Sequence, residues 1–373
     1  MGKAIRTFVM VTAFAALPVA AAHAHDDHAA GAHAIGTIEG ASPALAAFLE
    51  HVSAAAMMQA AEVVDCTLSG GTETKCAKLV LTQAPAHVPG PWCPKTITDG
   101  PESGGFWVKD GKAYDVDGEF VKNLAEFYND PNWQMYDPET GDVLVTRSFD
   151  ACFGAARPDV WREYHHYCAQ CTPDQLVLAP NFTFFIPLQP VRAAAPSPLR
   201  DQPGAGVALN GVRFAGGVPL NDITDAYTIA PLDKCGGHVN PFEGYHYHFV
   251  TDCVETVETG TEHAQQIGIS LDGYGIYERL DANGNEPKDL DECRGHSSPE
   301  LGYHYHANPV GPNAIIDCMK GELGCAGSPG TQVCNATIPP PARATQNPLL
   351  PQIEDPGLRG HEEERRKGNV APG

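Results

Sequence analysis

One sequence pattern occurs twice in the chain, at residues 232–248 and 290–306, 58 positions apart. The first copy reads LDKCGGHVNPFEGYHYH and the second reads LDECRGHSSPELGYHYH, so eleven of the seventeen positions are identical. The identical positions include every Cys, His and Tyr of the segment, together with two glycines that can form turns. The chain must therefore fold into a structure that accommodates an internal Cys-x-x-His…Tyr-His-Tyr-His duplication.

The Tyr-His-Tyr-His tetrad that ends each copy alternates two residue types. In a β-strand such alternation places both histidines on one face and both tyrosines on the other, with the two histidine Cα atoms about 7 Å apart. Gly244 and Gly302 precede the two tetrads. A turn at these glycines would fold His238 or His296 back over its strand.

Each copy therefore offers three histidines to one ion. These candidate ligands are His238, His246 and His248 in the first copy and His296, His304 and His306 in the second. Three imidazole nitrogens with an open fourth position are typical of zinc or copper sites. Whether the six histidines form one shared site or two separate sites is not decided by the sequence.

Two other interpretations of the histidines remain open. Cys235 and Cys293 could add a thiolate to each set, although an exported protein favours disulfides at these positions. Alternatively, the imidazoles could be hydrogen-bonded to Asp233, Asp291 or backbone carbonyls and serve only the fold, or a histidine could act as a general base without metal.

The first 24 residues have the organisation of a signal peptide. Lys3 and Arg6 precede an apolar run, residues 8–21, which is too short and too rich in alanine for a membrane span, and Ala22-His23-Ala24 offers a cleavage site. We therefore expect an exported protein, periplasmic or extracellular. Removal of this segment changes the net charge from −22 to about −24. Such an acidic chain is not expected to bind nucleic acid or anionic lipid.

The chain contains twelve cysteines, all after the predicted signal peptide, and in an oxidising compartment most should be paired. Four local disulfides are plausible, Cys66–Cys76, Cys235–Cys253, Cys293–Cys318 and Cys325–Cys334. The other four cysteines would then pair among themselves, and these are Cys93, Cys152, Cys168 and Cys171.

Glycine and proline together account for 70 of the 373 residues, which favours short strands and turns over long helices. We expect a mainly β, disulfide-stapled domain at residues 176–335, plus a smaller N-terminal α+β region at 42–175. A His-rich arm at 25–41 and a Pro-rich, charged, disordered tail at 336–373 would flank them. Helices are predicted from Pro43 to about Val64, capped by Ser42, and at Gly118–Tyr128. Strands are predicted at 182–187, 207–214 and 267–277.

Other residues are candidates for chemistry outside the repeats. Asp272 could be a catalytic residue that orients a histidine or binds substrate, or a turn aspartate that accepts hydrogen bonds from backbone amides. Residues Asp281–Glu292 partly fit a calcium loop, but Glu286 stands where that loop needs glycine. Cleavage after Ala24 would place His25 and His28 beside a terminal amine, where they could chelate Cu(II) or form an arm that binds metal only adventitiously.

The block from about Phe182 to Cys318 resembles the YHYH protein family, which is named for the tetrad. The resemblance rests on ordered motifs: FFIPL at 184–188, GVALNGVRF at 206–214, LDKCGGH at 232–238, IGISLDGYGIY at 267–277, LDECRGH at 290–296, and the two tetrads. It implies an extracytoplasmic domain, often bacterial, and brings no established activity. Glu278 departs from the expected pattern, in which a glycine would follow Ile-Tyr.

Three functions are compatible with these observations. The favoured one is an exported metal-binding protein that holds copper or zinc through the histidines of both repeats. The first alternative is a metal-dependent hydrolase or oxidase that uses the same histidines. The second is a disulfide-stabilised structural or interaction domain without metal. Because neither an H-E-x-x-H nor a G-x-S-x-G motif occurs, the sequence favours a non-enzymatic role.

Overall fold

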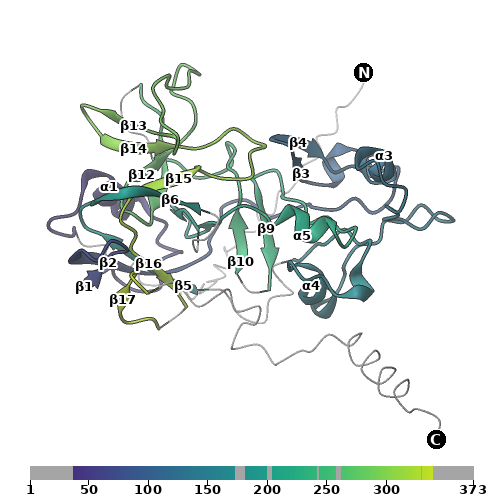
Figure 1. Cartoon of the computed structure of the whole chain (residues 1–373), viewed down its shortest axis with the longest axis horizontal. Helices are drawn as coiled ribbons and strands as arrows, with labels where there is room; N and C mark the ends of the chain where they lie inside the picture. The colour runs from purple at the N-terminus through teal and green to yellow at the C-terminus, as the bar shows by residue number, and fades with distance from the viewer. Residues whose placement is uncertain are drawn as a thin grey trace, which may run out of the picture. The chain divides into compact units, whose positions relative to one another are not determined.

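The computed structural model describes residues 37–172, 181–199, 204–241, 243–257, 262–328 and 330–338 (Figure 1). The predicted signal peptide, His25, His28 and residues 339–373 of the predicted tail lie outside these ranges. Within them the protein is mainly β, as predicted, with seventeen strands and only short helices. None of the described helices is long and apolar enough to cross a membrane.

An eight-stranded sheet contains both histidine repeats, in the order β13-β14-β12-β11-β7-β8-β10-β9. Its first four strands in sequence are β7 (Gly206–Ala208), β8 (Arg213–Phe214), β9 (Gly237–Asn240) and β10 (Gly244–Tyr247). The other four are β11 (Gln266–Ser270), β12 (Gly275–Tyr277), β13 (Gly295–Ser298) and β14 (Gly302–His306). The two repeats therefore occupy opposite ends of one sheet.

The two halves of this sheet are built in the same way. Each consists of an antiparallel hairpin (β7–β8 or β11–β12), a parallel contact (β8–β10 or β12–β14) and a second antiparallel hairpin. The halves meet through the antiparallel pair β7–β11, where Val207 lies opposite Ile269. The two halves are therefore related by a pseudo-twofold axis. The duplicated unit has four strands and is longer than the seventeen-residue pattern.

Sequence analysis did not detect the full length of the duplicated unit. GVALNGVRF at 206–214 and GISLDGYGI at 268–276 form equivalent hairpins, but they are 62 residues apart whereas the tetrads are 58 apart. A change of spacing within the unit conceals the similarity from an ungapped comparison. The alignment makes Asn210 equivalent to Asp272 and Arg213 equivalent to Gly275.

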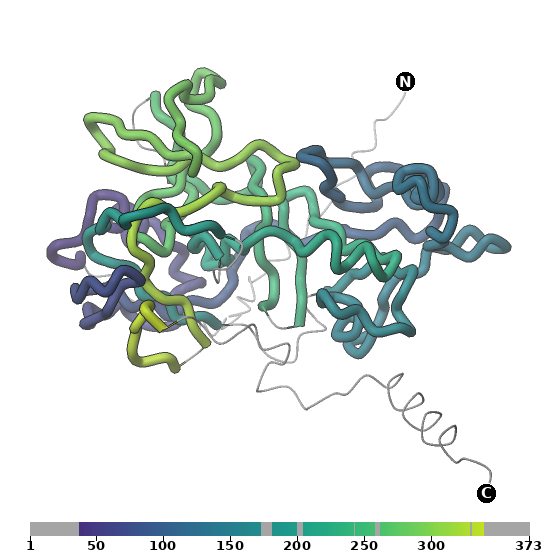
Figure 2. Tube along the Cα trace, viewed as in Figure 1, coloured from purple at the N-terminus to yellow at the C-terminus, as the bar shows by residue number. Residues whose placement is uncertain are grey.

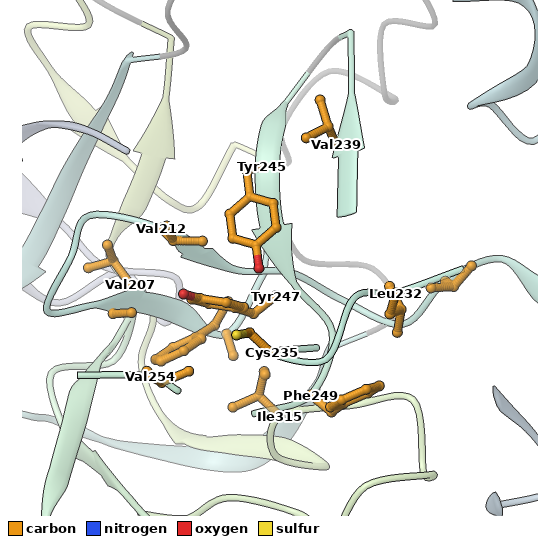
Figure 3. Close-up of a cluster of buried hydrophobic side chains, with 14 of the residues drawn as sticks. Val207, Val212, Leu232, Cys235, Val239, Tyr245, Tyr247, Phe249, Val254 and Ile315 are labelled. Atoms are coloured by element: carbon orange, nitrogen blue, oxygen red, sulfur yellow. The ribbon is translucent and has the colours of Figure 1, made fainter. Parts of the chain in front are cut away.

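The tyrosines of both tetrads point to the face opposite the histidines. Figure 3 shows Tyr245 and Tyr247 among buried hydrophobic side chains that include Val207 and Phe249. The Tyr245 hydroxyl donates to Asp233 at 2.8 Å, and in the second copy the Tyr303 hydroxyl donates to Asp291 at 2.9 Å.

The second tyrosine of each tetrad contacts the loop of the first hairpin of its own half. Asn210 donates its side-chain amide to the Tyr247 hydroxyl at 3.0 Å, and the Tyr305 hydroxyl donates to Asp272 at 2.6 Å. Asp272 is fully buried and also accepts hydrogen bonds from the Ser270 hydroxyl and the Gly321 amide. These contacts fix the tyrosine face of the sheet and thereby the direction of the histidines.

A second, five-stranded sheet joins distant parts of the chain, in the order β16-β5-β2-β1-β17. Its strands are β1 (Glu62–Thr67), β2 (Glu73–Thr82), β5 (Asn181–Pro187), β16 (Cys325–Gly327) and β17 (Cys334–Asn335). Figure 2 shows the purple segment with β1 and β2 beside the yellow segment with β16 and β17. The predicted N-terminal region and the predicted β domain therefore share this sheet.

The remaining elements are short. Two-stranded sheets pair β3 (Phe106–Lys109) with β4 (Lys112–Asp115), and β6 (Arg192–Pro198) with β15 (Cys318–Gly321). The helices are α1 (Pro43–His51), α2 (Gly118–Lys122), α3 (Leu124–Phe127), α4 (Phe149–Ala155) and α5 (Leu220–Thr224), with single 3₁₀ turns at 101–103 and 162–164.

The two helix predictions have different outcomes. Gly118–Tyr128 is confirmed, divided into α2 and α3. The predicted helix from Pro43 begins as expected, with the Ser42 hydroxyl accepting from the Leu45 amide, but its extension to Val64 is wrong. It ends at His51 because the next amides find tertiary partners: Ser53 donates to the Leu209 carbonyl and Met58 to that of Val80.

All twelve cysteines form disulfides. The four predicted local pairs are confirmed, and the other four cysteines pair as Cys93–Cys168 and Cys152–Cys171. Cys235 and Cys293 are consequently bonded to Cys253 and Cys318 and do not supply thiolates to the histidines. Each repeat is thus fastened covalently to a segment that follows its own sheet half.

We predict that Tyr305→Phe lowers the free energy of unfolding by about 2 kcal/mol, because buried Asp272 loses a hydrogen-bond donor and the Lys320 amide loses its acceptor. Urea unfolding of the disulfide-intact protein measures the change. Tyr114→Phe is the control, since among the described residues no hydrogen bond of the Tyr114 hydroxyl is found, and it should change stability by less than about 0.5 kcal/mol. Equal effects of the two variants would contradict the role given to Asp272.

Candidate metal centres

The β9–β10 hairpin brings the three histidines of the first repeat together. His238 lies directly opposite His246 in the strand register, because Gly244, with φ of 69°, forms the turn between the strands. His248 follows β10 on the same face, and the three ring centroids are 4.7–4.9 Å apart. We call His238, His246 and His248 cluster 1.

In every ring of cluster 1 the Nδ1 atom forms a hydrogen bond with a backbone carbonyl oxygen. The Nδ1 atoms of His238, His246 and His248 lie 3.3, 3.0 and 2.6 Å from the carbonyl oxygens of Ala230, Gly244 and Gly216, respectively. Because a carbonyl oxygen only accepts, each Nδ1 carries the proton and each Nε2 carries a lone pair. The Nε2 atoms of His238 and His248 face each other at 3.1 Å.

The β13–β14 hairpin repeats this arrangement at the other end of the sheet. His296 lies opposite His304, and the Nδ1 atoms of His304 and His306 lie 2.9 and 2.7 Å from the carbonyl oxygens of Gly302 and Glu278. His296 differs, because its Nδ1 donates to the Asp289 carboxylate at 2.9 Å. The Nε2 atoms of His296 and His306 are 3.2 Å apart.

A fourth histidine, His263, joins the second set. Its Nδ1 lies 2.9 Å from the Ala264 carbonyl oxygen, and its Nε2 lies 3.0 Å from Nε2 of His304. One nitrogen from each of the four rings lies within 4.8 Å of the others, as is also true of cluster 1. We call His263, His296, His304 and His306 cluster 2.

Sequence analysis missed His263 because nothing in the repeat pattern indicates it. The residues 58 and 62 positions earlier are Ala205 and Asp201, so the first half of the duplication has no matching histidine. His263 comes just before β11 and reaches cluster 2 only through the tertiary pairing of β11, β12 and β14. A long-range contact of this kind leaves no local sequence signal.

Burial favours the neutral form of four of these imidazoles, those of His238, His248, His304 and His306. The side chains of His246, His248, His304 and His306 are at most 4 % exposed. Desolvation lowers the pKa of His238 and His304 to about 4 and that of His306 to about 3, and it lowers the pKa of His248 well below its usual range. Neutral imidazole is the form that binds a metal ion.

The spacing of the nitrogens fits a tetrahedral metal ion. Zinc–nitrogen bonds of about 2.0–2.1 Å place neighbouring ligand nitrogens of a tetrahedron about 3.3 Å apart. The Nε2–Nε2 distances are 3.1 Å for His238–His248, 3.0 Å for His263–His304 and 3.2 Å for His296–His306, and one nitrogen of every ring lies within 4.8 Å of those of its cluster. Hydrogen bonds from Nδ1 to carbonyl or carboxylate oxygens are also the usual outer contacts of metal-binding histidines. Both clusters are therefore geometrically compatible with a metal ion.

The surroundings of the two clusters differ. A Glu243 carboxylate oxygen lies 3.9 Å from Nε2 of His246, and the other oxygen lies 3.6 Å from the Arg213 guanidinium. A cavity of about 70 Å³ adjoins all three histidines of cluster 1 and is lined also by Glu243, Trp92 and Arg157. In the second repeat Leu301 stands 58 residues after Glu243.

The other candidate residues make contacts away from the two clusters. Asp272 bonds to Tyr305 on the opposite face of the sheet, and no hydrogen bond joins it to a histidine in the described residues. In the proposed calcium loop, Asp281 accepts from the Asn283 and Asn285 amides, whereas Glu292 forms an ion pair with Lys320. These contacts are those of an Asx turn and of an ion pair between an exposed glutamate and a buried lysine.

Asp233 and Asp291, proposed as partners of the imidazoles, have a different role. Besides the tyrosine hydroxyls, one oxygen of Asp233 accepts from the amides of Cys235 and Gly237, and Asp291 accepts from those of Cys293 and Gly295. Each aspartate closes the turn that leads into the first histidine strand of its repeat. The imidazoles donate their hydrogen bonds to the carbonyl groups named above and not to these two aspartates, and His296 donates to Asp289.

Residues 183–289 match the model of the YHYH protein family. This part of the chain is therefore a YHYH domain, in agreement with the resemblance seen in the motifs. The match includes cluster 1 and His263 and ends just before the second repeat. No curated protein and no solved structure matches the chain.

We predict that the metal-free protein loses stability as the pH falls from about 6.5 toward 4. Unfolded histidines take up protons in this range, whereas His304 and His306, with folded pKa values of about 4 and 3, do not. Each such group makes the free energy of unfolding fall by up to about 1.4 kcal/mol per pH unit. Urea unfolding in the presence of a chelator at several pH values between 5 and 6.5 measures the slope.

The matched variant for this experiment is His304→Asn with His306→Asn, since asparagine keeps an N–H donor near the position of Nδ1. It should show a slope shallower by as much as about 2.7 kcal/mol per pH unit. An unchanged slope would mean that these two histidines are protonated in the folded protein as readily as in the unfolded chain.

Proposed function

We propose that this is an exported metal-binding protein that holds copper or zinc through the histidines of its two repeats. The observation that carries the proposal is the common orientation of the seven imidazoles. Each Nδ1 is committed to an acceptor oxygen, and the opposite nitrogens converge in two groups. Lone pairs that converge in a buried place repel one another, and a bound cation is stabilised by them.

The ligand chemistry selects the class of metal. Imidazole nitrogen suits zinc, copper, iron and nickel, whereas calcium and magnesium prefer oxygen ligands. The four imidazoles of cluster 2, with one nitrogen of each ring within 4.8 Å of the others, suit zinc or Cu(I), and the three of cluster 1 suit either metal with one further ligand. Because cluster 1 and cluster 2 lie at opposite ends of the sheet, the proposal is two separate sites.

Export is supported by the cysteines. All twelve are paired in six disulfides, which persist in oxidising compartments and are rare in the cytosol. A periplasmic or extracellular protein meets free metal ions without the competition of cytosolic thiols. The disulfides also leave no cysteine to compete with the histidines for the ion.

We predict two equivalents of copper or zinc per chain in the protein exported from its host and purified without an affinity tag. Replacing His246, His248, His304 and His306 together by Asn should remove both, because each cluster loses two ligands. Replacing only the pair in one cluster should leave one equivalent. Elemental analysis of the folded proteins gives the stoichiometry, with His51→Ala, which removes an exposed histidine of α1, as the control.

Metal that is absent from the parent protein, or that is equally abundant in the fourfold variant, would overturn the proposal. The repeats would then be scaffold, as in the interpretation of the protein as a structural or interaction domain. Circular dichroism and the disulfide content of each variant establish that it is folded before its metal is counted.

A further inference from the structure

The two halves of the duplicated sheet differ most in the side chains that stand beside their histidines. In the second half His263 supplies a fourth imidazole, and the first half has no histidine at the corresponding places in the sequence. In the first half Glu243 lies beside His246, and its counterpart in the second half is Leu301. Each half therefore has a polar side chain beside its histidines that the other half lacks.

The halves also differ at the position of the residue that pairs with Glu243. Arg213 lies 3.6 Å from Glu243 and packs its guanidinium 4.6 Å from the ring centroid of Phe182. The residue equivalent to Arg213 in the second half is Gly275, which cannot form an ion pair. The Arg213–Glu243 pair in one half thus corresponds to Gly275 and Leu301 in the other. Arg213 holds the Glu243 carboxylate near His246 and balances the negative charge of that carboxylate.

The cavity beside cluster 1 gives a small molecule access to an ion held there. It is lined by His238, His246, His248 and Glu243 and by largely apolar groups such as Trp92 and Ile223. A water molecule needs about 10–15 Å³ of such space, so about 70 Å³ accommodates roughly five water-sized groups. A ligand of this size is a small anion or a molecule of a few heavy atoms.

We infer that the two centres have different roles: cluster 2 is a closed four-imidazole site, and cluster 1 with Glu243 is an open site that binds a small anion from the cavity. The inference rests on the proposed function, since both centres must hold metal. Four imidazoles complete a tetrahedral ion, as in structural sites, whereas three imidazoles leave positions for an exchangeable ligand, as in reactive sites.

The ligand class follows from charge and size. Arg213 balances Glu243 and Asp159 pairs with Arg157 at 2.7 Å, so the positive charge of a bound ion remains uncompensated in the cavity. A small anion that coordinates through oxygen or nitrogen satisfies this charge. The apolar walls favour an anion that is weakly hydrated.

Azide tests the inference because it is a small anion that gives an absorption band when it binds Cu(II). Two proteins are loaded with Cu(II): one keeps only cluster 1 (His304→Asn with His306→Asn), and the other keeps only cluster 2 (His246→Asn with His248→Asn). We expect saturable azide binding in the first and none in the second. Introducing His263→Ala into the second protein should open cluster 2 and create azide binding.

Glu243→Leu gives the first half the residue of the second. In the protein that keeps only cluster 1, it should weaken copper binding by about tenfold or more, with Glu243→Gln intermediate, while azide still binds the copper that remains. Competition with a chelator of known affinity measures this change. A copper affinity unaffected by Glu243→Leu would remove Glu243 from the site.

The outcomes separate this inference from the proposed function. If neither single-cluster protein binds copper, the proposed function fails. If both bind copper and azide binds both alike, or binds only the cluster 2 protein, the function stands and the division between an open and a closed site is overturned. Azide binding that persists when both clusters are removed would identify copper held elsewhere, and this result would also overturn the division between an open and a closed site.

Discussion

The geometry of each histidine hairpin depends on one aspartate at the turn that precedes it, Asp233 in the first copy and Asp291 in the second. Asp233 accepts from the amides of Cys235 and Gly237 and from the Tyr245 hydroxyl, and also from the Gly90 amide. Asp291 makes the first three of these contacts with its own copy. These bonds tie the first histidine strand to the tyrosine face of the second strand. The register that follows sets His238 against His246 and His296 against His304. A change in this turn would displace the histidines without touching any of them.

The two faces of the eight-stranded sheet make different kinds of contact. On one face of the sheet, tyrosines bond to aspartate or asparagine and pack in the core, as Tyr247 and Tyr305 do. On the other face, main-chain carbonyls, and Asp289 in the case of His296, accept hydrogen bonds from the Nδ1 atoms, so that the Nε2 atoms are directed at one another. The alternation of Tyr and His therefore assigns one face to stability and the other to the proposed binding of metal. Substitutions on the first face should change unfolding more than binding.

The sequence predicts local features of this arrangement well and distant ones poorly. Period-two alternation indicates the shared face of His246 and His248, and nearby glycines indicate the reversal, because both are properties of a few adjacent residues. The short-range disulfides are predictable for the same reason. His263 and the Arg213–Glu243 pair depend on strand pairing across tens of residues, which no local pattern encodes. The helix expected to reach Val64 fails similarly, since tertiary partners for Ser53 and Met58 override the helical periodicity.

The antiparallel β7–β11 pair at the pseudo-twofold axis has an evolutionary consequence. Two identical four-stranded units that meet edge to edge through one self-complementary strand have the symmetry of a homodimer. In a homodimer every substitution appears in both subunits, so two sites must remain alike. Once the units are fused in a single polypeptide, a mutation enters one half alone. The covalent connection between β10 and β11 is therefore what permits one centre to acquire Glu243 and the other to acquire His263.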